Sequence, residues 1–246
     1  MSDESREKFR ARYRANVSPY YSGWFHLGTL CFGAGGLIWF AISLMSGTTW
    51  MDFWIVPVAA LGVNFFEYAG HRWFGHKKTK ILKLFYQRHT GDHHTFFEEH
   101  AMGYQMVLDW RVVIFPLYLL VAFTVLAAIP GALILNWLFN INVAMLYAIT
   151  AISGYWLYEI LHFSYHLPRG STLERVFAAI PGWKYLRLFH TVHHFRDTMH
   201  DVNFNVTIPL TDWVLGTLSF SSGDERAPDH EWVQARHGSK VSTPAE

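Results

Sequence analysis

The sequence predicts an all-α integral membrane protein, in which four transmembrane helices carry a helical, histidine-rich domain on the cytoplasmic side. Hydrophobic residues make up 51% of the 246 residues and charged residues only 16%, against about 25% charged in a typical soluble domain. The 15 histidines cluster next to long uncharged segments. With a single cysteine, Cys31, the composition excludes a disordered chain, a basic nucleic-acid-binding protein and a disulfide-rich scaffold.

The charged residues leave two long segments almost empty. Between residues 15 and 66 the only charged side chain is Asp52, and between residues 112 and 158 there is none. Each segment can hold two membrane crossings, because one crossing needs about 20 apolar residues. A soluble helical protein would need a charged face on its helices, which these runs lack. We therefore expect four spans, at residues 24–44, 53–70, 112–129 and 141–161.

The connections within each pair of spans are short and lack Lys and Arg. Residues 46–49 join the first two spans, and Pro130-Gly131 should end the third span. The apolar residues 132–140 are too few for another crossing. We expect them to form a re-entrant or interfacial segment.

The positive-inside rule places these connections away from the cytoplasm. All Lys and Arg residues lie elsewhere, so both termini and the histidine-rich domain should be cytoplasmic. Residues 5–14 (SREKFRARYR) should form a basic helix on anionic lipid or a solvated tail. We divide the chain into a basic juxtamembrane segment (residues 1–20), a single membrane domain (residues 21–222) and a polar C-terminal tail (residues 223–246).

Ten of the fifteen histidines form four tight clusters, and each half of the chain contributes a pair and then a triplet. Histidines three or four residues apart share one face of a helix and can converge on one point. The first pair is five residues apart, so we expect a bend or a helix end near Gly75. The ten histidines are His71 and His76, then His89, His93 and His94, then His162 and His166, and finally His190, His193 and His194.

Clustered imidazoles favour a metal site over a proton relay, which would need a chain of groups. Tetrahedral zinc takes four ligands per ion, so two zinc ions would leave two of the ten histidines unused. Ten ligands shared by two ions give five each and leave an open octahedral position for dioxygen. Iron is therefore the preferred metal, with zinc possible as a substitute in a purified sample.

Several nearby polar residues could orient the imidazoles through their second ring nitrogen. We expect His100 and His200 to lie outside the ligand set, and His26, His230 and His237 to be incidental. The candidate orienting residues are Glu67, Glu159, Asp92, Asp197, Asp201 and Asn203.

The chain resembles the fatty acid hydroxylase superfamily from about residue 66 to residue 218. This integral-membrane group includes fatty acid 2-hydroxylases, which the pattern resembles most, sterol-modifying oxidases and carotenoid hydroxylases. The motifs that carry the resemblance are EYAGHRWFGH (67–76), HTGDHH (89–94), GYWLYEILHFSYH (154–166), HTVHH (190–194) and NFNVTIPLTDWVLGT (203–217).

The resemblance implies an oxygen-dependent enzyme whose ten box histidines hold two iron ions, with Tyr158 and Glu159 lining the site. Two positions depart from the family. Asn205 replaces a usual glycine, and three residues separate His89 from His93 where many members have two, which blurs the substrate class. About twenty residues precede the first span, so the electron donor is expected to be a separate protein.

These features predict an oxygen-dependent hydroxylase of a membrane-lipid acyl chain. The second span of 18 residues is about 27 Å long and only just crosses the hydrocarbon core, which places the metals at the interface. The oxidised carbon should therefore lie near the carboxyl or head-group end, at the 2-position. The alternatives are carotenoid or sterol hydroxylation, desaturation, a zinc-dependent membrane hydrolase and a non-catalytic metal or haem carrier. The sequence does not indicate the oligomeric state.

Overall fold

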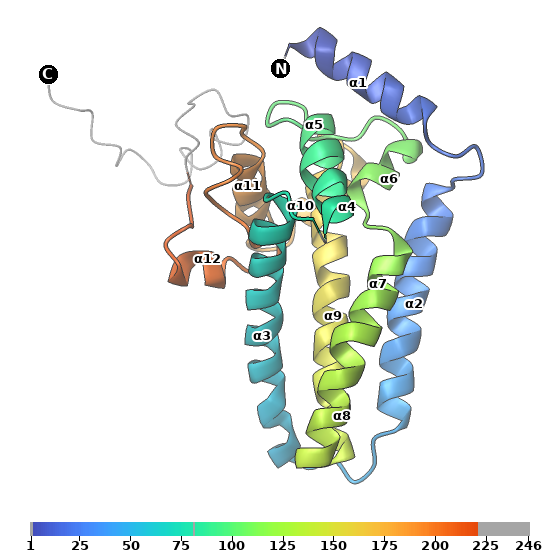
Figure 1. The fold of residues 1–246 in the computed structure, drawn as a ribbon, viewed down its shortest axis with the longest axis vertical. Helices are drawn as coiled ribbons and strands as arrows, with labels where there is room; N and C mark the ends of the chain where they lie inside the picture. Colours follow the sequence, from blue (N-terminus) through green and yellow to red (C-terminus); the bar gives the residue numbers. More distant parts are fainter. Residues whose placement is uncertain (1, 81, 221–246) are drawn as a thin grey trace, which may run out of the picture.

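The computed structural model describes residues 2–80 and 82–220, and within these ranges the regular structure is entirely helical. The four long helical segments stand side by side in one bundle, and the shorter helices gather at one end of it (Figure 1). The predicted all-α fold and the predicted number of spans are confirmed. The segments long and apolar enough to cross a membrane are Gly23–Ser43, Trp50–Gly75, Val107–Leu138 and Ile141–Tyr165.

The first two spans begin with polar caps. Ser22 accepts a hydrogen bond from the backbone N–H of Phe25 at the start of α2 (Gly23–Ser43). Asp52 lies in the 3-10 turn η1 (Trp50–Trp54) before α3 (Ile55–Ala69), where it accepts from the N–H of Thr49 at 2.8 Å and from Asn140 at 3.0 Å. The one charged residue of the first apolar segment therefore ties together the two turns at the far end of the bundle.

The third span differs from the prediction at both ends. The short helix α6 (Trp110–Val113) is followed by the extended residue Ile114, and α7 (Leu117–Phe123) begins only after Pro116. The expected stop at Pro130 is wrong, because a π-helical turn, η5 (Thr124–Ala128), leads directly into α8 (Ile129–Leu138) with the proline in its first turn. The missing N–H and the ring of a proline are tolerated in the first turn of a helix.

The expected re-entrant segment at residues 132–140 is therefore also wrong. Most of it continues the third helix as far as Leu138, and Asn140 caps the next helix by accepting from the N–H of Val143 at 3.0 Å. That helix, α9 (Ile141–Tyr165), packs against α2, α3 and α8. A Cβ at Gly154 would lie 2.6 Å from a methyl group of Val63, so glycine permits the close approach of α3 and α9.

The N-terminal helix α1 (Asp3–Ala15) packs on the protein through three arginines, of which Arg6 pairs with the buried Glu98 at 3.2 Å. The buried Arg10 donates to the carbonyls of Phe96 at 2.9 Å and Ala101 at 2.8 Å, and Arg14 pairs with Asp109 at 2.7 Å. The prediction that this helix lies on lipid or in solvent is wrong for this face. A guanidinium group can donate several hydrogen bonds at once, which suits it to cap the carbonyls of an irregular loop.

The remaining helices form the histidine-rich end of the molecule (Figure 1). Two of them, η2 and η3, are π-helical turns, in which residues five apart are joined by the backbone hydrogen bond. In chain order the elements are η2 (Gly70–Gly75), α4 (Lys83–Tyr86), η3 (Gln87–His93), α5 (His94–Phe96), η4 (Val107–Asp109), α10 (Thr172–Ala178), α11 (Trp183–His193) and α12 (Leu210–Val214).

Candidate metal centre

The ten predicted histidines converge from η2, η3 and α5 and from the C-terminal ends of α9 and α11, and all ten are buried. Nine of them form two groups whose nearest ring nitrogens lie within 4.8 Å of one another. His194 joins the second group, because its Nε2 lies 3.2 Å from that of His93 and 3.0 Å from that of His190. The first group is His71, His76, His89, His94 and His193, and the second is His93, His162, His166, His190 and His194.

The π-helical turns explain how unevenly spaced histidines meet. In η2 the N–H of His76 bonds to the carbonyl of His71 at 3.2 Å, so residues five apart lie one turn apart. The expected helix end near Gly75 is confirmed. A Cβ at Gly75 would lie 2.9 Å from the ring of His89, so glycine at this position lets His89 approach His71 and His76.

Main-chain carbonyls orient at least half of the imidazoles. The Nδ1 atoms of these rings donate to backbone oxygens, which fixes both the ring plane and the tautomer. The pairs are His71 with Phe204 (2.5 Å), His93 with Val112 (3.0 Å), His166 with Met102 (2.9 Å), His193 with Val202 (2.8 Å) and His194 with Phe97 (2.8 Å).

The acidic residues expected to orient the imidazoles do not bond to them. Asp92 accepts from Gln87 and pairs with Arg88. Within residues 2–80 and 82–220, none of Glu67, Glu159, Asp92, Asp197 and Asp201 has a hydrogen bond to a ring of the cluster. An acidic residue can accept from a ring only if its side chain reaches that ring, whereas a main chain that passes the ring places its carbonyls there directly. The identity of a residue does not show where its main chain passes.

Inside the cluster, Nε2 atoms of neighbouring rings face one another with their lone pairs. Because a carbonyl can only accept, His93 and His194 carry their protons on Nδ1, and their Nε2 atoms are unprotonated in the neutral rings. These two Nε2 atoms lie 3.2 Å apart. Neighbouring nitrogen ligands about 2.1 Å from one ion are separated by about 3 Å. The donor set therefore fits a cation between the rings, which would remove the repulsion of the lone pairs.

Burial keeps these rings neutral. Desolvation lowers the pKa of His93, His94, His166 and His194 well below the usual value of 6.5, with further lowering from neighbouring histidines. Neutral imidazole is the form that binds a metal. The cluster is thus prepared as a nitrogen donor set at neutral pH.

The loop that leads into the C-terminal motif at residues 203–217 positions the rings of His71 and His193. The carboxylate of Glu67 accepts from the N–H and the hydroxyl of Thr207, at 2.9 and 2.5 Å, and from the N–H of Val206. The buried Asp212 accepts from the N–H groups of Phe204 at 3.0 Å and Asn205 at 2.6 Å. These bonds hold the loop whose carbonyls receive His71 and His193.

Asn203 and Asn205 have structural roles in the same loop. Asn203 adopts a left-handed backbone conformation, with φ of 56°, and its side chain bonds to the main chain of Phe189 and Ser219. Asn205 donates to the carbonyl of Asn64 at 2.9 Å and accepts from the N–H of Asp212 at 3.2 Å. The residue that replaces the family glycine therefore ties the loop to α3.

Glu159 and Tyr158 lie on the side of the cluster that faces the membrane spans. Glu159 is buried and accepts from the N–H of Phe115 at 3.2 Å and from the hydroxyl of Tyr155 at 3.0 Å. The ring of Tyr158 lies 5.6 Å from that of His162 and 6.0 Å from that of Phe115. Tyr158 therefore borders the second histidine group, and Glu159 contacts the chain that passes beside it.

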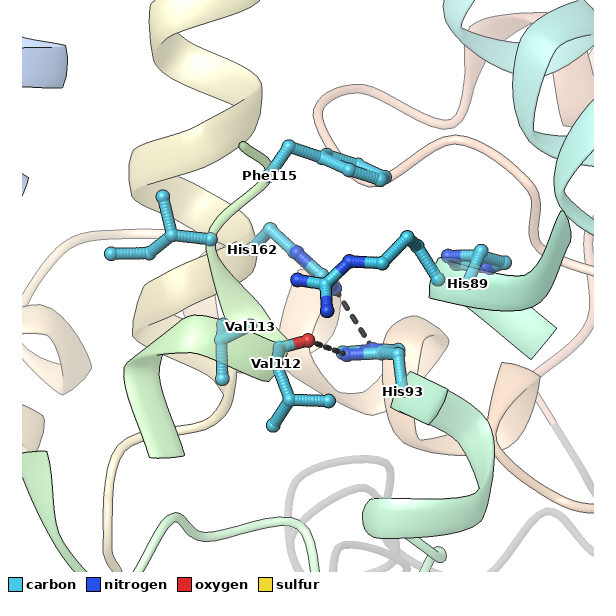
Figure 2. A pocket seen from close by; sticks show the side chains of 8 residues that line it. His89, His93, Val112, Val113, Phe115 and His162 are labelled. Carbon is cyan, nitrogen blue, oxygen red and sulfur yellow. Dashed lines mark hydrogen bonds between the residues drawn. The ribbon is translucent and has the colours of Figure 1, made fainter. Parts of the chain in front are cut away.

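A small cavity of about 10 Å³ touches both histidine groups (Figure 2). This volume admits about one water-sized molecule. His89 of the first group faces it together with His93 and His162 of the second, and Figure 2 shows His162 reaching toward His93 across it. The rest of its wall comes from Arg88, Val112, Val113, Ile114 and Phe115.

The other histidines take different places. The side chain of His100 is 44% exposed, and His200 is exposed with its ring 5.3 Å from that of His76. His26 is not incidental, because it is buried and its Nε2 lies 3.0 Å from the carbonyl oxygen of Phe115. Neither His26 nor Phe115 was predicted at the site, although Pro116 inside a predicted span was a signal of a broken helix. His230 and His237 lie outside the described residues.

Comparison with known proteins agrees with this geometry. The family model described as fatty acid hydroxylase matches residues 56–217, about two thirds of the chain. The chain belongs to the fatty acid hydroxylase family. The matched region contains all ten clustered histidines and the loop that orients His71 and His193, so the family match covers the candidate metal centre.

The fatty acid hydroxylase match is supported by similarity to two dihydroceramide fatty acyl 2-hydroxylases from Arabidopsis thaliana. One is 28% identical over 167 residues and the other 29% over 170 residues, in each case across 67% of this chain. The chain spans about three-fifths of the length of these relatives, 61% and 60%. No solved structure matches the chain.

Proposed function

We propose that the protein hydroxylates the acyl chain of a membrane lipid with dioxygen, using two iron ions held by the ten clustered histidines. The observation that carries the proposal is the arrangement of ten neutral imidazoles in two groups around facing Nε2 atoms. Membership of the fatty acid hydroxylase family and similarity to fatty acyl 2-hydroxylases support the reaction and the substrate class.

Five nitrogen ligands per ion favour iron over zinc. A hydrolytic or structural zinc site uses three or four protein ligands. Five imidazole ligands around each ion would instead leave one position of an octahedral site open. Iron supplies the ability to activate dioxygen for attack on an unactivated C–H bond. One oxygen atom enters the C–H bond and the other leaves as water, with electrons and protons from a separate donor protein.

The protein's own residues hold the site dry and aligned. His93, His162 and His166 are 2%, 1% and 0% exposed, so bulk water is excluded from the second group. The carbonyls bonded to Nδ1 prevent the rings from turning, and the small cavity between the groups leaves space for one small molecule. The ring of Tyr158 borders the second histidine group, and Glu159 accepts a hydrogen bond from the N–H of Phe115.

The position of the cluster supports oxidation near the head group. His71 lies in the last turn of the second candidate span, and His162 lies near the end of the fourth. We propose that the cluster lies at the cytoplasmic interface, where a lipid would present the carbons next to its carboxyl or amide group. We propose the 2-position as the site of hydroxylation.

The test is hydroxylation under oxygen-18 gas by the iron-loaded protein in membranes, with an added reductase system and ceramide-type lipid. We expect one labelled oxygen atom in the lipid, at carbon 2 by mass spectrometric mapping. A mid-chain hydroxyl, a hydroxylated ring or a new double bond would contradict the proposed position or reaction. Lipid cleavage without label, supported by zinc alone, would instead indicate a hydrolase.

A further inference from the structure

We propose that Phe115 determines which carbon of the acyl chain reaches the histidine cluster, and that His26 and Glu159 are the positioning residues that hold it. The inference rests on the proposed function and adds a specificity-determining residue to it. It begins from the break in the third span, where an irregular main chain passes the cavity that touches both histidine groups.

The break leaves the backbone of Phe115 without helical partners. Ile114 is extended, with ψ of 131°, and Pro116 disfavours the helical conformation at the residue before it. The N–H and the carbonyl of Phe115 therefore need other partners, because an unpaired backbone group in an apolar environment is costly. Side chains from two different spans supply both of them.

Glu159 of α9 accepts from the N–H of Phe115 at 3.2 Å, and His26 of α2 bonds to its carbonyl at 3.0 Å. The carbonyl can only accept, so the Nε2 of His26 carries the proton and its Nδ1 accepts from the hydroxyl of Tyr21 at 3.1 Å. Tyr155 donates to the other oxygen of Glu159 at 3.0 Å. This chain of bonds fixes the main chain at Phe115 between the spans.

The ring of Phe115 lies along one side of the cavity (Figure 2). It stacks on Phe85 with centroids 5.2 Å apart and planes at 15°, and it lies 6.0 Å from Tyr158 and 6.5 Å from His89. The cavity of about 10 Å³ has no room for an acyl segment while the ring is in this place. An acyl chain that enters from the side of Phe85 and Tyr158 must displace this ring to bring a carbon to the imidazoles.

A fixed backbone that carries a ring free to rotate about its side-chain bonds would set which carbon is oxidised. With its main chain held by His26 and Glu159, Phe115 can yield only by rotation of its side chain. The ring then limits how many methylene groups pass into the site. A smaller side chain would admit neighbouring carbons, so oxidation would spread from one position to several.

The test compares product positions for Phe115→Ala, Phe115→Leu, His26→Ala and His26→Gln with the unchanged protein. Phe32→Ala is the matched control, because Phe32 is 85% exposed on the outer face of α2. We expect Phe115→Ala to raise the share of products at adjacent carbons about tenfold, as for one methylene in an apolar pocket, and Phe115→Leu to raise it less. We expect His26→Ala to raise it too, and His26→Gln to restore the original pattern because its amide can donate to the carbonyl.

Metal content by mass spectrometry should be unchanged in all variants. A uniform loss of product with an unchanged positional pattern in Phe115→Ala and His26→Ala would overturn the inference, since that result is typical of a structural role. A diazirine-bearing acyl lipid gives a readout that needs no turnover. We expect it to label the peptide containing Phe115 and to label less of it in Phe115→Ala.

The two proposals can fail separately. If the unchanged protein places no label from oxygen-18 gas in lipid but the photoprobe labels the Phe115 peptide, the proposed reaction is wrong and the acyl-binding wall remains supported. If hydroxylation at carbon 2 occurs but the photoprobe labels other peptides and the variants keep the product pattern, Phe115 is not the determinant.

Discussion

At the scale of single residues, the two histidine groups divide neighbouring side chains between them. His93 and His94 are adjacent in the sequence, yet His93 belongs to the second histidine group and His94 belongs to the first. Their ring planes differ by 87°, because each Nε2 faces a different set of partners. Adjacent histidines therefore probe the two proposed metal positions separately.

We predict that His93→Ala and His94→Ala each lower the metal content from about two ions per chain to about one, since each change removes one ligand from a different group. Activity should be lost in both variants because both ions are needed. Inductively coupled plasma mass spectrometry of the purified protein measures the ions. His100→Ala, on a half-exposed histidine outside both groups, is the control. Retention of both ions in either variant would remove that histidine from the site.

At the scale of elements, the cluster depends on main-chain carbonyls of residues other than histidine. The loop after α11 presents the carbonyls of Val202 and Phe204 to His193 and His71. It is held there by Glu67 of α3 and by Asp212 of α12. Glu67 and Asp212 thus position the imidazoles indirectly, because they accept from several main-chain N–H groups of this loop.

We predict that Glu67→Gln lowers the free energy of unfolding by about 1–3 kcal/mol, because a neutral amide oxygen is a weaker acceptor than a carboxylate for the N–H groups of Val206 and Thr207. The looser loop should also reduce the metal held by the first group, to which His71 and His193 belong. Thermal unfolding and metal analysis of the purified protein measure the two effects. Asp92→Asn, on a partly exposed acid away from this loop, is the control. Equal stability of Glu67→Gln and the unchanged protein would contradict the role of the loop.

At the scale of the whole molecule, the histidine cluster joins elements from both halves of the chain. Its rings come from the ends of two spans and from two segments between and after them, and α1 closes over the same end through Arg10 and Arg14 (Figure 1). Bound metal would therefore link distant parts of the fold.

We predict that removal of the metal by a chelator lowers the temperature of unfolding, because the facing Nε2 lone pairs then repel one another. At a metal concentration about 100 to 1,000 times the dissociation constant, binding stabilises the folded state by about 3–4 kcal/mol. Differential scanning fluorimetry in detergent measures the shift. The variant His93→Ala should show a smaller shift than the unchanged protein. An identical curve with and without chelator would argue against a bound metal.

We also predict the orientation of the chain in the membrane. A topology reporter fused after Thr48 should lie outside the cytoplasm, and one fused after Lys80 should lie inside it, since the lysines and arginines lie on the Lys80 side. Reporter activity at the two positions measures this. The reverse pattern would move the histidine cluster to the opposite face of the membrane.

The sequence by itself determined the features that depend on local composition and spacing. Two uncharged segments indicated the four spans, and the histidine spacing indicated ten residues that meet at one end of the bundle. The motifs around those histidines also indicated the fatty acid hydroxylase family. These features are readable because hydrophobicity over about 20 residues and helical periodicity are local properties.

Only the tertiary structure decided the features that depend on where the main chain passes. The carbonyls that orient His93 and His194, the inward face of α1, the helix that continues through Pro130 and the link from His26 to Phe115 all join distant or irregular segments. Every residue has the same backbone carbonyl, so residue identity does not show which one meets an imidazole. The division of the ten histidines into two groups likewise follows from the packing of helices, which spacing along the chain does not specify.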